Sequence, residues 1–594
     1  MAACTAVESP TTGSDPAEPG GDTAAGRFAT AAATASAIAS ASALLAACGG
    51  GGSGLASDLP GSGGTPPPVQ TVPPSERDAA RFLTQASFGA SAPEQIAALQ
   101  KQGFEAWLFE QFNKPTALHV AYLESQRGRD AGPGEARRVS EEMSYEAIWQ
   151  QWLQGDDPLR GRMVWALLQI VVISNIAPDI RPHAMSSYMD MLGRNAFGNF
   201  RTLLQDVALH PAMGYYLNML ESEKEDAKSG THPNENFARE VLQLFSIGLV
   251  KLDVDGSTRL GPDNQPIPTY DEAVVKGYAQ AFSGWSYGAL DNSRDSTFHD
   301  HDDNDEALWV VPMKAWKNYH SPGAKTLLDG RVLPAGQTPE KDMADALDSI
   351  FLHPNVGPFI SRQLIQRFTT SNPSKDYVRR VATTFNDNGS GVRGDLRAVL
   401  RAVLLDPEVR GDTAATQARF GKPREPVLRL AAMLRALGAK SKNGRNDIHY
   451  LDSADDSLGQ SPLLAPTVFN FYAPGYRPPG PLSIAGMVAP EFQITTETSV
   501  VGSLNFFADL LWSGGYGNGD SRLKLDFAPW EALAAEPAKL VDRIDLMFFM
   551  RQMSTPTRER LTRLASALPS NNPRERVRSA LMLAAMSPDH VIQK

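Results

Sequence analysis

The stretch THPNENFAREVLQLFSIGL, residues 231–249, contains the pattern that decides the fold class. Pro233 favours the first turn of a helix, because a proline lacks the N–H that this turn leaves unused. After it, apolar and polar residues separate onto two sides of a 3.6-residue period. The apolar side holds Phe237, Val241, Leu244, Phe245 and Gly248, and the polar side holds Glu235, Arg239, Gln243 and Ser246. The stretch therefore predicts an amphipathic helix.

The same period recurs along most of the chain. Ser75 is a predicted N-cap for a helix that ends near Gly89, and helical spacing continues through residues 96–113, 147–154 and 162–175. With 594 residues, the chain is long enough to bury a large core. The sequence therefore predicts a mainly α protein with one large multi-helix domain.

Four X-Pro pairs interrupt the helical segments, and each predicts a corner between helices, because proline suits the first turn of a new helix. The pairs are His210–Pro211, His353–Pro354, Asp406–Pro407 and Ser587–Pro588.

A small β-hairpin insertion is expected between Leu249 and Thr269, because the sequence alternates around Asp255–Gly256. The next helix is expected to begin with a capping box formed by Thr269 and Glu272. Residues 286–325 and 441–490 are predicted long loops, which in a compact domain are usually functional or disordered.

Charge and cysteine content exclude several functions. The net charge of −11 provides no attraction for phosphate backbones, so nucleic acid is not an expected partner. The two cysteines, Cys4 and Cys48, both precede the predicted body. The body therefore contains no catalytic thiol, no disulfide and no thiolate zinc site.

Residues 28–47, FATAAATASAIASASALLAA, form a run that is too weakly apolar for a spanning helix and fits a signal segment better. Its last residues and Cys48 resemble the lipobox of bacterial lipoproteins, in which the thiol accepts a diacylglycerol. Cys48 is therefore the predicted lipidation site and membrane anchor. The alternative is a disordered Ala/Ser-rich tail with a chance cysteine, since Glu8, Asp15, Glu18 and Asp22 stand where a basic region is expected.

These features divide the chain into three parts. Residues 1–47 are the leader and signal segment, residues 48–74 are a Gly/Ser/Pro-rich tether, and residues 75–594 are the helical body. A glycine follows Cys48, which resembles outer-membrane sorting. The expected location is the cell envelope, with a lipid anchor in the outer membrane.

The polar side of the helix predicted within residues 231–249 is the leading candidate for a catalytic site. Glu235 could act as a general base, Arg239 as an anion clamp and His232 as a proton carrier, with Glu240 on their flank. The alternative is a solvated face on which Glu235 and Arg239 form an i,i+4 ion pair worth about 0.3 kcal/mol.

A second candidate is the stretch FHDHDDNDEALW, residues 298–309. His299, His301, Asp302 and Asp305 offer imidazole and oxygen donors for a divalent metal ion, although the spacing is not that of an EF-hand. The alternative is a solvated acidic loop. Downstream, His320 and Lys325 form a further polar pair.

Three later clusters combine polar and aromatic residues in Pro-rich turns, which can bind sugars or peptides but more often hold a loop in place. They contain Arg367, Ser371, Asn372, Lys422, Arg424, Glu425, Asn470, Tyr472 and Tyr476.

Seven stretches jointly resemble the bacterial family called domain of unknown function 1800. They cover residues 80–89, 232–249, 270–285, 353–374, 404–410, 421–429 and 461–476. The resemblance implies a large, mainly helical exported protein without an established activity, often accompanied by a second exported protein. One departure is Ser321, which follows His320 where the family often has an acid, and it weakens a metal or acid–base role there.

Two functions remain open from the sequence. The first is a lipid-anchored envelope enzyme, a metal-assisted hydrolase in which His232, Glu235, Arg239 and Glu240 converge with His320 or the acidic loop. The second is a non-catalytic surface module that binds a partner protein or a glycan in an open groove. Neither the substrate nor the metal is identified by the sequence.

Overall fold

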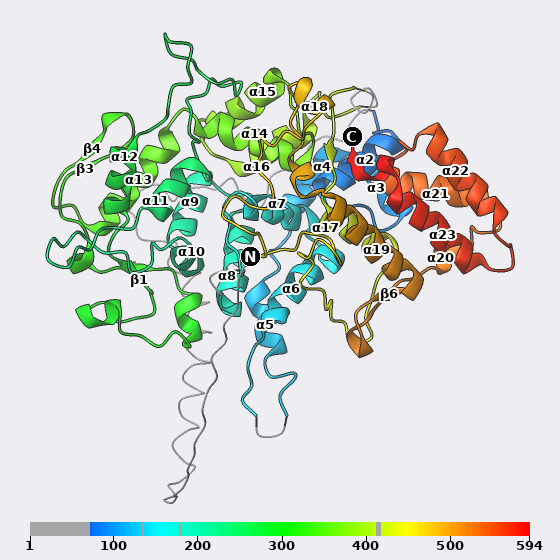
Figure 1. Ribbon diagram of the computed structural model, residues 1–594, viewed down its shortest axis with the longest axis horizontal. Helices are drawn as coiled ribbons and strands as arrows, with labels where there is room; N and C mark the ends of the chain where they lie inside the picture. The colour runs from blue at the N-terminus through cyan, green and yellow to red at the C-terminus, as the bar shows by residue number, and fades with distance from the viewer. Residues whose placement is uncertain (1–71, 133–134, 177–179, 412–416) are drawn as a thin grey trace, which may run out of the picture. The chain divides into compact units, whose positions relative to one another are not determined.

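The computed structural model describes residues 72–132, 135–176, 180–411 and 417–594, and the body is mainly α-helical, as predicted (Figure 1). The predicted leader, Cys48 and nearly all of the tether lie outside these residues. The first half of the body contains α2 (Glu76–Ala86), α3 (Pro93–Gln102), α4 (Phe104–Phe112), α5 (His119–Gln126), α6 (Glu141–Gln154), α7 (Pro158–Leu168), α8 (Pro182–Asn195), α9 (Phe200–Ala208), α10 (Pro211–Tyr216), α11 (Asn236–Gln243) and α12 (Glu272–Ala281).

The second half continues with longer helices and several short ones. It contains α13 (Pro339–Leu352), α14 (Val356–Phe368), α15 (Lys375–Asn386), α16 (Leu396–Leu405), α17 (Pro426–Ala436), α18 (Pro481–Ile484), α19 (Glu497–Ser513), α20 (Ala528–Glu531), α21 (Pro537–Phe549), α22 (Thr555–Ala567), α23 (Pro573–Met586) and α24 (Pro588–Val591). Single 3₁₀ turns are η1 (Asp295–Phe298), η2 (Glu306–Trp309), η3 (Lys317–Tyr319), η4 (Leu328–Gly330), η6 (Pro490–Ile494) and η7 (Gly519–Ser521).

Among the described residues, the strands form four short antiparallel pairs. They are β1 (Trp285–Ser286) with β2 (Lys314–Ala315), β3 (Lys325–Thr326) with β4 (Val332–Leu333), β5 (Lys422–Pro423) with β8 (Ile592–Gln593), and β6 (Gly515–Tyr516) with β7 (Leu523–Lys524). The β5–β8 pair brings the C-terminal residues back to the middle of the sequence. Arg81 of α2 also donates a hydrogen bond to the carbonyl of Lys594 at 2.8 Å, so both ends of the described body lie side by side (Figure 1).

The four X-Pro corners share one physical device, in which the residue before the proline caps the following turn. His210 Nδ1 accepts from the N–H of Ala212, and His353 Nδ1 accepts from that of Asn355, both at 3.2 Å. Asp406 and Ser587 accept equivalent bonds at 2.8 and 3.2 Å. The chain continues into α10, α14 and α24 after three of these corners, but into a turn after Asp406–Pro407, where no helix follows directly.

The predicted β-hairpin is confirmed as a ladder of isolated bridges. Leu252 pairs with Thr258, and Val250 pairs with Pro268 across a second turn. Gly256 has φ +77°. The tight turns that connect hairpin strands require a positive φ, which glycine adopts without strain.

The predicted capping box before α12 is wrong. Thr269 donates its hydroxyl hydrogen bond to the carbonyl of Gly248 and so closes the hairpin instead. The N-cap is Asp271, whose carboxylate accepts from the N–H of Val274 at 3.1 Å. The N-cap predicted at Ser75 is confirmed, because Ser75 Oγ accepts from the N–H of Asp78 at 3.1 Å.

One continuous apolar core joins the helices, with the fully buried rings of Trp149, Trp152 and Trp165 in edge contact near its centre. Such large rings contribute strongly to core stability. In the described ranges, no helix has both the length and the hydrophobicity that crossing a bilayer requires.

Candidate binding groove

The predicted catalytic residues His232, Glu235, Arg239 and Glu240 lie in and just before α11, and they are not gathered into one cleft. Helix α11 begins at Asn236, three residues after Pro233, because the N–H of Asn234 donates to Ser222 Oγ at 2.8 Å and holds the preceding turn. His232 lies in this turn and is exposed. Glu235 pairs with Arg239 at 3.1 Å, as a solvated face would have it. The pair is worth only a few tenths of a kcal/mol.

Glu240 differs from its neighbours because it is buried, with 6 % of its surface exposed. Burial raises the pKa of its carboxyl, against a smaller opposing effect of Arg239. Burial and, second, the charge of Glu240 raise the pKa of Tyr216 to about 12. Oε2 of Glu240 and the hydroxyl of Tyr270 have no hydrogen-bond partner among the described residues. Glu240 is thus a buried carboxyl whose pKa lies above its ordinary value.

The acidic loop places its two histidines on a carboxylate that the sequence did not suggest. His299 Nδ1 lies 3.2 Å from Oε2 of Glu221, and His301 Nε2 contacts Oε1 of the same carboxylate. Glu221 has φ +60°, an uncommon backbone conformation that turns the chain toward the loop. The relevant signal, a glutamate far upstream, was not recognisable without the fold.

The other two residues of the predicted metal quartet have local partners. Asp302 accepts hydrogen bonds from the backbone and side-chain amides of Asn304, at 3.0 and 2.8 Å. Asp305 caps η2 by accepting from the N–H of Ala307 at 3.0 Å. The carboxylates beside the two histidines are Glu221, which contacts both, and Asp303, whose Oδ1 lies 3.1 Å from His301 Nδ1, whereas Asp302 and Asp305 terminate turns.

One group of potential metal ligands occurs within the described ranges. It consists of Glu124, His183 and Glu306, whose ligand atoms all lie within 4.8 Å of one another. Arg127, however, already lies among them. Its guanidinium pairs with Glu124 at 2.7 Å and with Glu306 at 2.5 Å. The charge that a cation would supply is therefore provided by Arg127, and the cluster is better described as an ion-pair network.

His320 and Lys325 meet through Asp342, which sequence reasoning missed. Oδ2 of Asp342 lies 2.8 Å from His320 Nε2 and 2.7 Å from Lys325 Nζ, and Asp342 is fully buried. His320 Nδ1 faces the carbonyl of Ser283 at 2.8 Å, so both ring nitrogens face acceptors. Burial raises the pKa of Asp342, but hydrogen bonds from His320 and Lys325 outweigh this effect and lower it. The trio is saturated and joins the loop to α13.

A different region contains an open cavity with a volume of about 470 Å³, which we call the groove. It lies between α14, the end of α11, the hairpin and the loop around Phe469. Its walls are mainly apolar, and Leu249 and Phe469 expose 55 % and 51 % of their surfaces at its edge. The lining is formed by Gln169, Ile170, Gln243, Leu244, Ile247, Gly248, Leu249, Val250, Leu252, Gly256, Thr258, Phe359, Arg362, Gln363, Gln366, Arg367, Val468, Phe469, Ala473, Pro474 and Gly475.

A buried charged cluster lies behind the groove and consists of Arg162, Arg367, Lys422, Glu425 and Glu491. The backbone carbonyl of Arg367, at the C-terminal end of α14, accepts from Arg162 at 2.6 Å and from Lys422 at 3.0 Å. Cations are favoured at this end of a helix. Lys422 also pairs with Glu491 at 2.8 Å, so charge is largely balanced within the cluster.

The two acids of the cluster respond differently to burial. Burial raises the pKa of Glu425, but the positive charges of Lys422, Arg162 and Arg367 outweigh this effect and lower it. For Glu491, burial dominates and raises the pKa despite the ion pair with Lys422. Glu425 is therefore the stable anion of the cluster.

Several buried polar atoms of the groove lack a hydrogen-bond partner in the described part of the chain. They include Nε2 of Gln363, Oε1 of Gln366 and Nε of Arg367, which belong to one face of α14 and line the groove. These side chains expose only 7 %, 3 % and 3 % of their surfaces. Buried polar groups are normally satisfied, so this concentration indicates a place for water or a ligand.

Backbone strain points to the same place. Leu463 and Asn470 both adopt positive φ, +62° and +67°, in the loop that supplies Phe469 and Gly475 to the groove. Asn470 donates to Oε1 of Gln169 at 3.2 Å, and the hydroxyl of Tyr472 donates to the same oxygen at 2.8 Å. Strained residues of this kind often occur where a loop forms a binding site.

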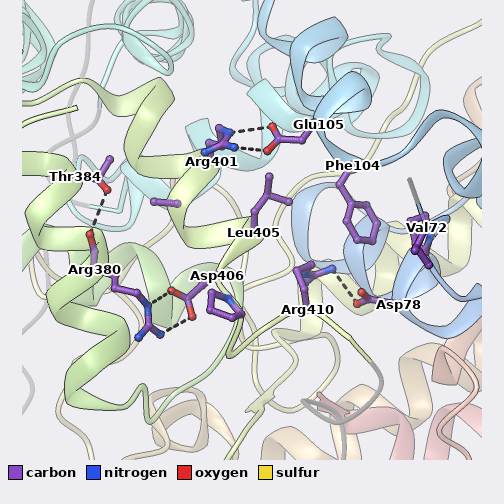
Figure 2. A pocket seen from close by; sticks show the side chains of 13 residues that line it. Val72, Asp78, Phe104, Glu105, Arg380, Thr384, Arg401, Leu405, Asp406 and Arg410 are labelled. Atoms are coloured by element: carbon purple, nitrogen blue, oxygen red, sulfur yellow. Dashed lines mark hydrogen bonds and ion pairs between the residues drawn. The ribbon is translucent and has the colours of Figure 1, made fainter. Parts of the chain in front are cut away.

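A second cavity, of about 510 Å³, lies where Val72 and Pro74 meet α4, α15 and α16 (Figure 2). Its three arginines are all paired with carboxylates. Arg380 pairs with Asp406 at 2.7 Å, Arg410 pairs with Asp78 at 3.2 Å, and Arg401 pairs with Glu105 (Figure 2). This cavity therefore has little unpaired charge with which to recognise a ligand, unlike the groove.

The fold and the groove together define a class, a mainly α-helical protein with an apolar concave site above a buried charged cluster. Residues 81–592 match the family described as Protein of unknown function (DUF1800), and the chain belongs to this family. The family resemblance noted in the sequence is thereby confirmed. Comparisons with curated proteins and with solved structures gave no match.

Proposed function

We propose that this protein is a lipid-anchored protein of the bacterial cell envelope whose helical body is a non-catalytic binding module, and that the groove is its binding site. The anchor is Cys48, and the tether of residues 48–74 separates the body from the membrane. A groove with apolar walls and a few polar groups is the usual form of a ligand site.

One observation carries the assignment of the groove. Three of the sequence stretches on which the family resemblance rests, residues 232–249, 353–374 and 461–476, are far apart in the chain, yet all three line the groove. A fourth stretch, residues 421–429, supplies Lys422 and Glu425 to the cluster behind it. These stretches thus come together in space at the groove. The polar face of α11, in contrast, forms a network of ion pairs at the surface.

The groove is tested with Nile red, a neutral dye whose fluorescence rises in apolar surroundings. Gly475 lines the groove, and a Cβ there would meet no atom within 4 Å, so Gly475→Trp can obstruct the groove without a clash at the backbone. The matched control is Gly323→Trp, at an equally open glycine outside the groove. We expect dye binding to fall at least tenfold in Gly475→Trp only. Equal binding in both variants would contradict the proposal.

The anchor is tested separately by membrane fractionation of cells that produce the full chain. Cys48→Ser is expected to move the protein from the membrane to the soluble fraction, because the thiol is the group that accepts the diacylglycerol. Unchanged fractionation would remove the lipid anchor from the proposal and leave the groove unaffected.

A second function, the metal-assisted hydrolase, keeps one supporting observation. Residues 232–249, one of the stretches that carry the family resemblance, contact the segment that carries Glu221, since Asn234 bonds to Ser222, and Glu221 in turn contacts His299 and His301. A divalent ion there would act as a Lewis acid. His232 and Glu235 have no contact with His320, which is held by Ser283 and Asp342, so the binding module is the better-supported function.

A further inference from the structure

We propose that the ligand of the groove is an extended apolar peptide with a free C-terminal carboxylate. This inference rests on the proposed function and names the ligand of the same site. Three features carry it: the apolar walls, the hydrogen-bonding groups of α14, and two arginines without acidic partners.

The walls select for apolar side chains. Ile247, Leu252, Phe359 and Val468 face a space that is large enough for a few side chains and open at its edge. Burying apolar surface there contributes about 25 cal/mol per Å². This term favours any apolar ligand and does not by itself distinguish a peptide from an acyl chain.

The hydrogen-bonding groups of α14 do distinguish a peptide from an acyl chain. Gln366 Nε2 donates to the carbonyls of Ser371 and Pro474, at 3.0 and 3.1 Å, which fixes Oε1 as the unpartnered acceptor. Nε of Arg367 is an unpartnered donor on the same side of the helix. A peptide unit offers both an N–H and a C=O and can satisfy both groups. A fatty acid carboxylate only accepts and would leave Gln366 Oε1 unmatched.

The charge of the ligand follows from Arg362 and Arg477. Neither guanidinium forms an ion pair with any described residue, although the whole chain carries a net charge of −11. Arg362 lines the groove, and Arg477 follows the lining residue Gly475 by two positions in the chain. The surrounding protein and, second, the charge of Arg477 lower the pKa of Arg362. Two unpaired arginines favour a carboxylate, which can accept two hydrogen bonds from one guanidinium.

The experiment uses the soluble Cys48→Ser chain and a short fluorescein-labelled peptide of leucine, valine and phenylalanine with a free C-terminal carboxylate. The same peptide with a C-terminal amide and the lipid dodecanoate are the comparison ligands. The protein variants are Arg362→Gln, which removes the exposed cation of the groove, and Arg563→Gln, a control at an exposed arginine of α22. Urea unfolding checks that each variant is folded.

We expect the free-acid peptide to bind, to compete with Nile red and to lose affinity in Gly475→Trp. Arg362→Gln should weaken it roughly fivefold, with no effect on the amide peptide, because an exposed ion pair is worth about 1 kcal/mol. Arg563→Gln should leave both peptides unchanged.

Three other outcomes would overturn the inference and remain distinguishable. If Nile red binds in the groove but dodecanoate displaces it and the peptides do not, the ligand is a lipid and the binding module stands. If the dye itself is insensitive to Gly475→Trp, the groove is not a binding site and the proposed function fails with the inference. Equal affinity of the free-acid and amide peptides would show that the groove does not recognise the carboxylate of the ligand.

Discussion

The guanidinium carbon of Arg367 lies 4.8 Å from the centre of the Tyr472 ring, so a cation of α14 is stacked on an aromatic side chain from the strained loop. Such a cation–π contact is most favourable when it is desolvated, and both residues are buried here. This contact joins the loop to α14, and both elements supply residues that line the groove.

Tyr472→Phe is predicted to lower the free energy of unfolding by about 1 kcal/mol while leaving the stacked ring in place. The lost hydroxyl donates to Gln169 Oε1 at 2.8 Å, and a buried hydrogen bond typically contributes this amount. Urea unfolding measures the change. Tyr319→Phe is the control, because its hydroxyl bonds to the carbonyl of Asp295 at an exposed site, and its effect should stay within 0.5 kcal/mol. Equal effects would mean that the Tyr472 hydroxyl contributes nothing beyond a surface bond.

Asp342→Asn is predicted to be among the most destabilising single substitutions, with a loss of about 3 to 5 kcal/mol. Asp342 balances the buried Lys325 and contacts His320, and removing one partner leaves an uncompensated buried charge. Asp345→Asn provides the control on the same helix, since its partners Lys341 and Arg331 are exposed, and it should cost less than about 1 kcal/mol. Thermal and urea unfolding compare the two. A mild effect of Asp342→Asn would contradict the compensation of Lys325 by Asp342.

Acid sensitivity is predicted from the histidine that caps α10. Burial, with a smaller contribution from Arg194, lowers the pKa of His210 to about 3. The unfolded chain therefore binds this proton near pH 6.5 and the folded chain does not, so stability falls as the pH drops below 6.5. Between pH 6.5 and 5 the loss from His210 is on the order of 2 kcal/mol.

His210→Asn isolates this contribution, because asparagine can accept the cap hydrogen bond and does not titrate. The free energy of unfolding of the variant should fall less steeply with acid than that of the native chain. Parallel curves from pH 6.5 to 5 would contradict the assignment of His210 as a neutral cap.

The sequence predicts local structure well where the cause is local. Ser75 caps α2, and the His210 and His353 corners lie where proline demands them, because each depends on residues within one turn. The groove could not be predicted in this way, because Gln366 and Pro474 contact across more than a hundred residues of sequence. The polar face of α11 attracted attention through its composition, but composition does not show whether a face is solvated.

The same limit explains the outcome for the acidic loop and for Lys325. His299 and His301 were recognisable as donors, whereas Glu221 was separated from them by 78 and 80 residues. Asp342, which the structure places in the first turn of α13, was likewise inconspicuous in the sequence, although it lies at the centre of a buried trio.

Glu240→Gln is predicted to raise the free energy of unfolding by about 1 kcal/mol at pH 8. Burial raises the pKa of this carboxyl, so the folded protein resists its ionisation, and stability is lost as the pH rises through the folded-state pKa. A neutral amide of similar shape removes this penalty. Glu235→Gln is the control, because Glu235 is partly exposed in an ion pair with Arg239. Destabilisation by Glu240→Gln at pH 8 would indicate that the ionised form has a favourable partner and would revive a catalytic role.

The metal hypothesis for the acidic loop makes a residue-specific prediction about Zn²⁺. Both histidines contact Glu221, whereas Asp302 and Asp305 terminate turns, so any zinc site there should depend on Glu221. Competition with a chromophoric chelator should show binding that is lost in Glu221→Gln and His301→Ala but retained in Asp302→Asn. Loss in Asp302→Asn as well would restore the original quartet. If none of the proteins binds Zn²⁺, the histidines serve only to hold the loop against Glu221, and the hydrolase hypothesis loses its metal.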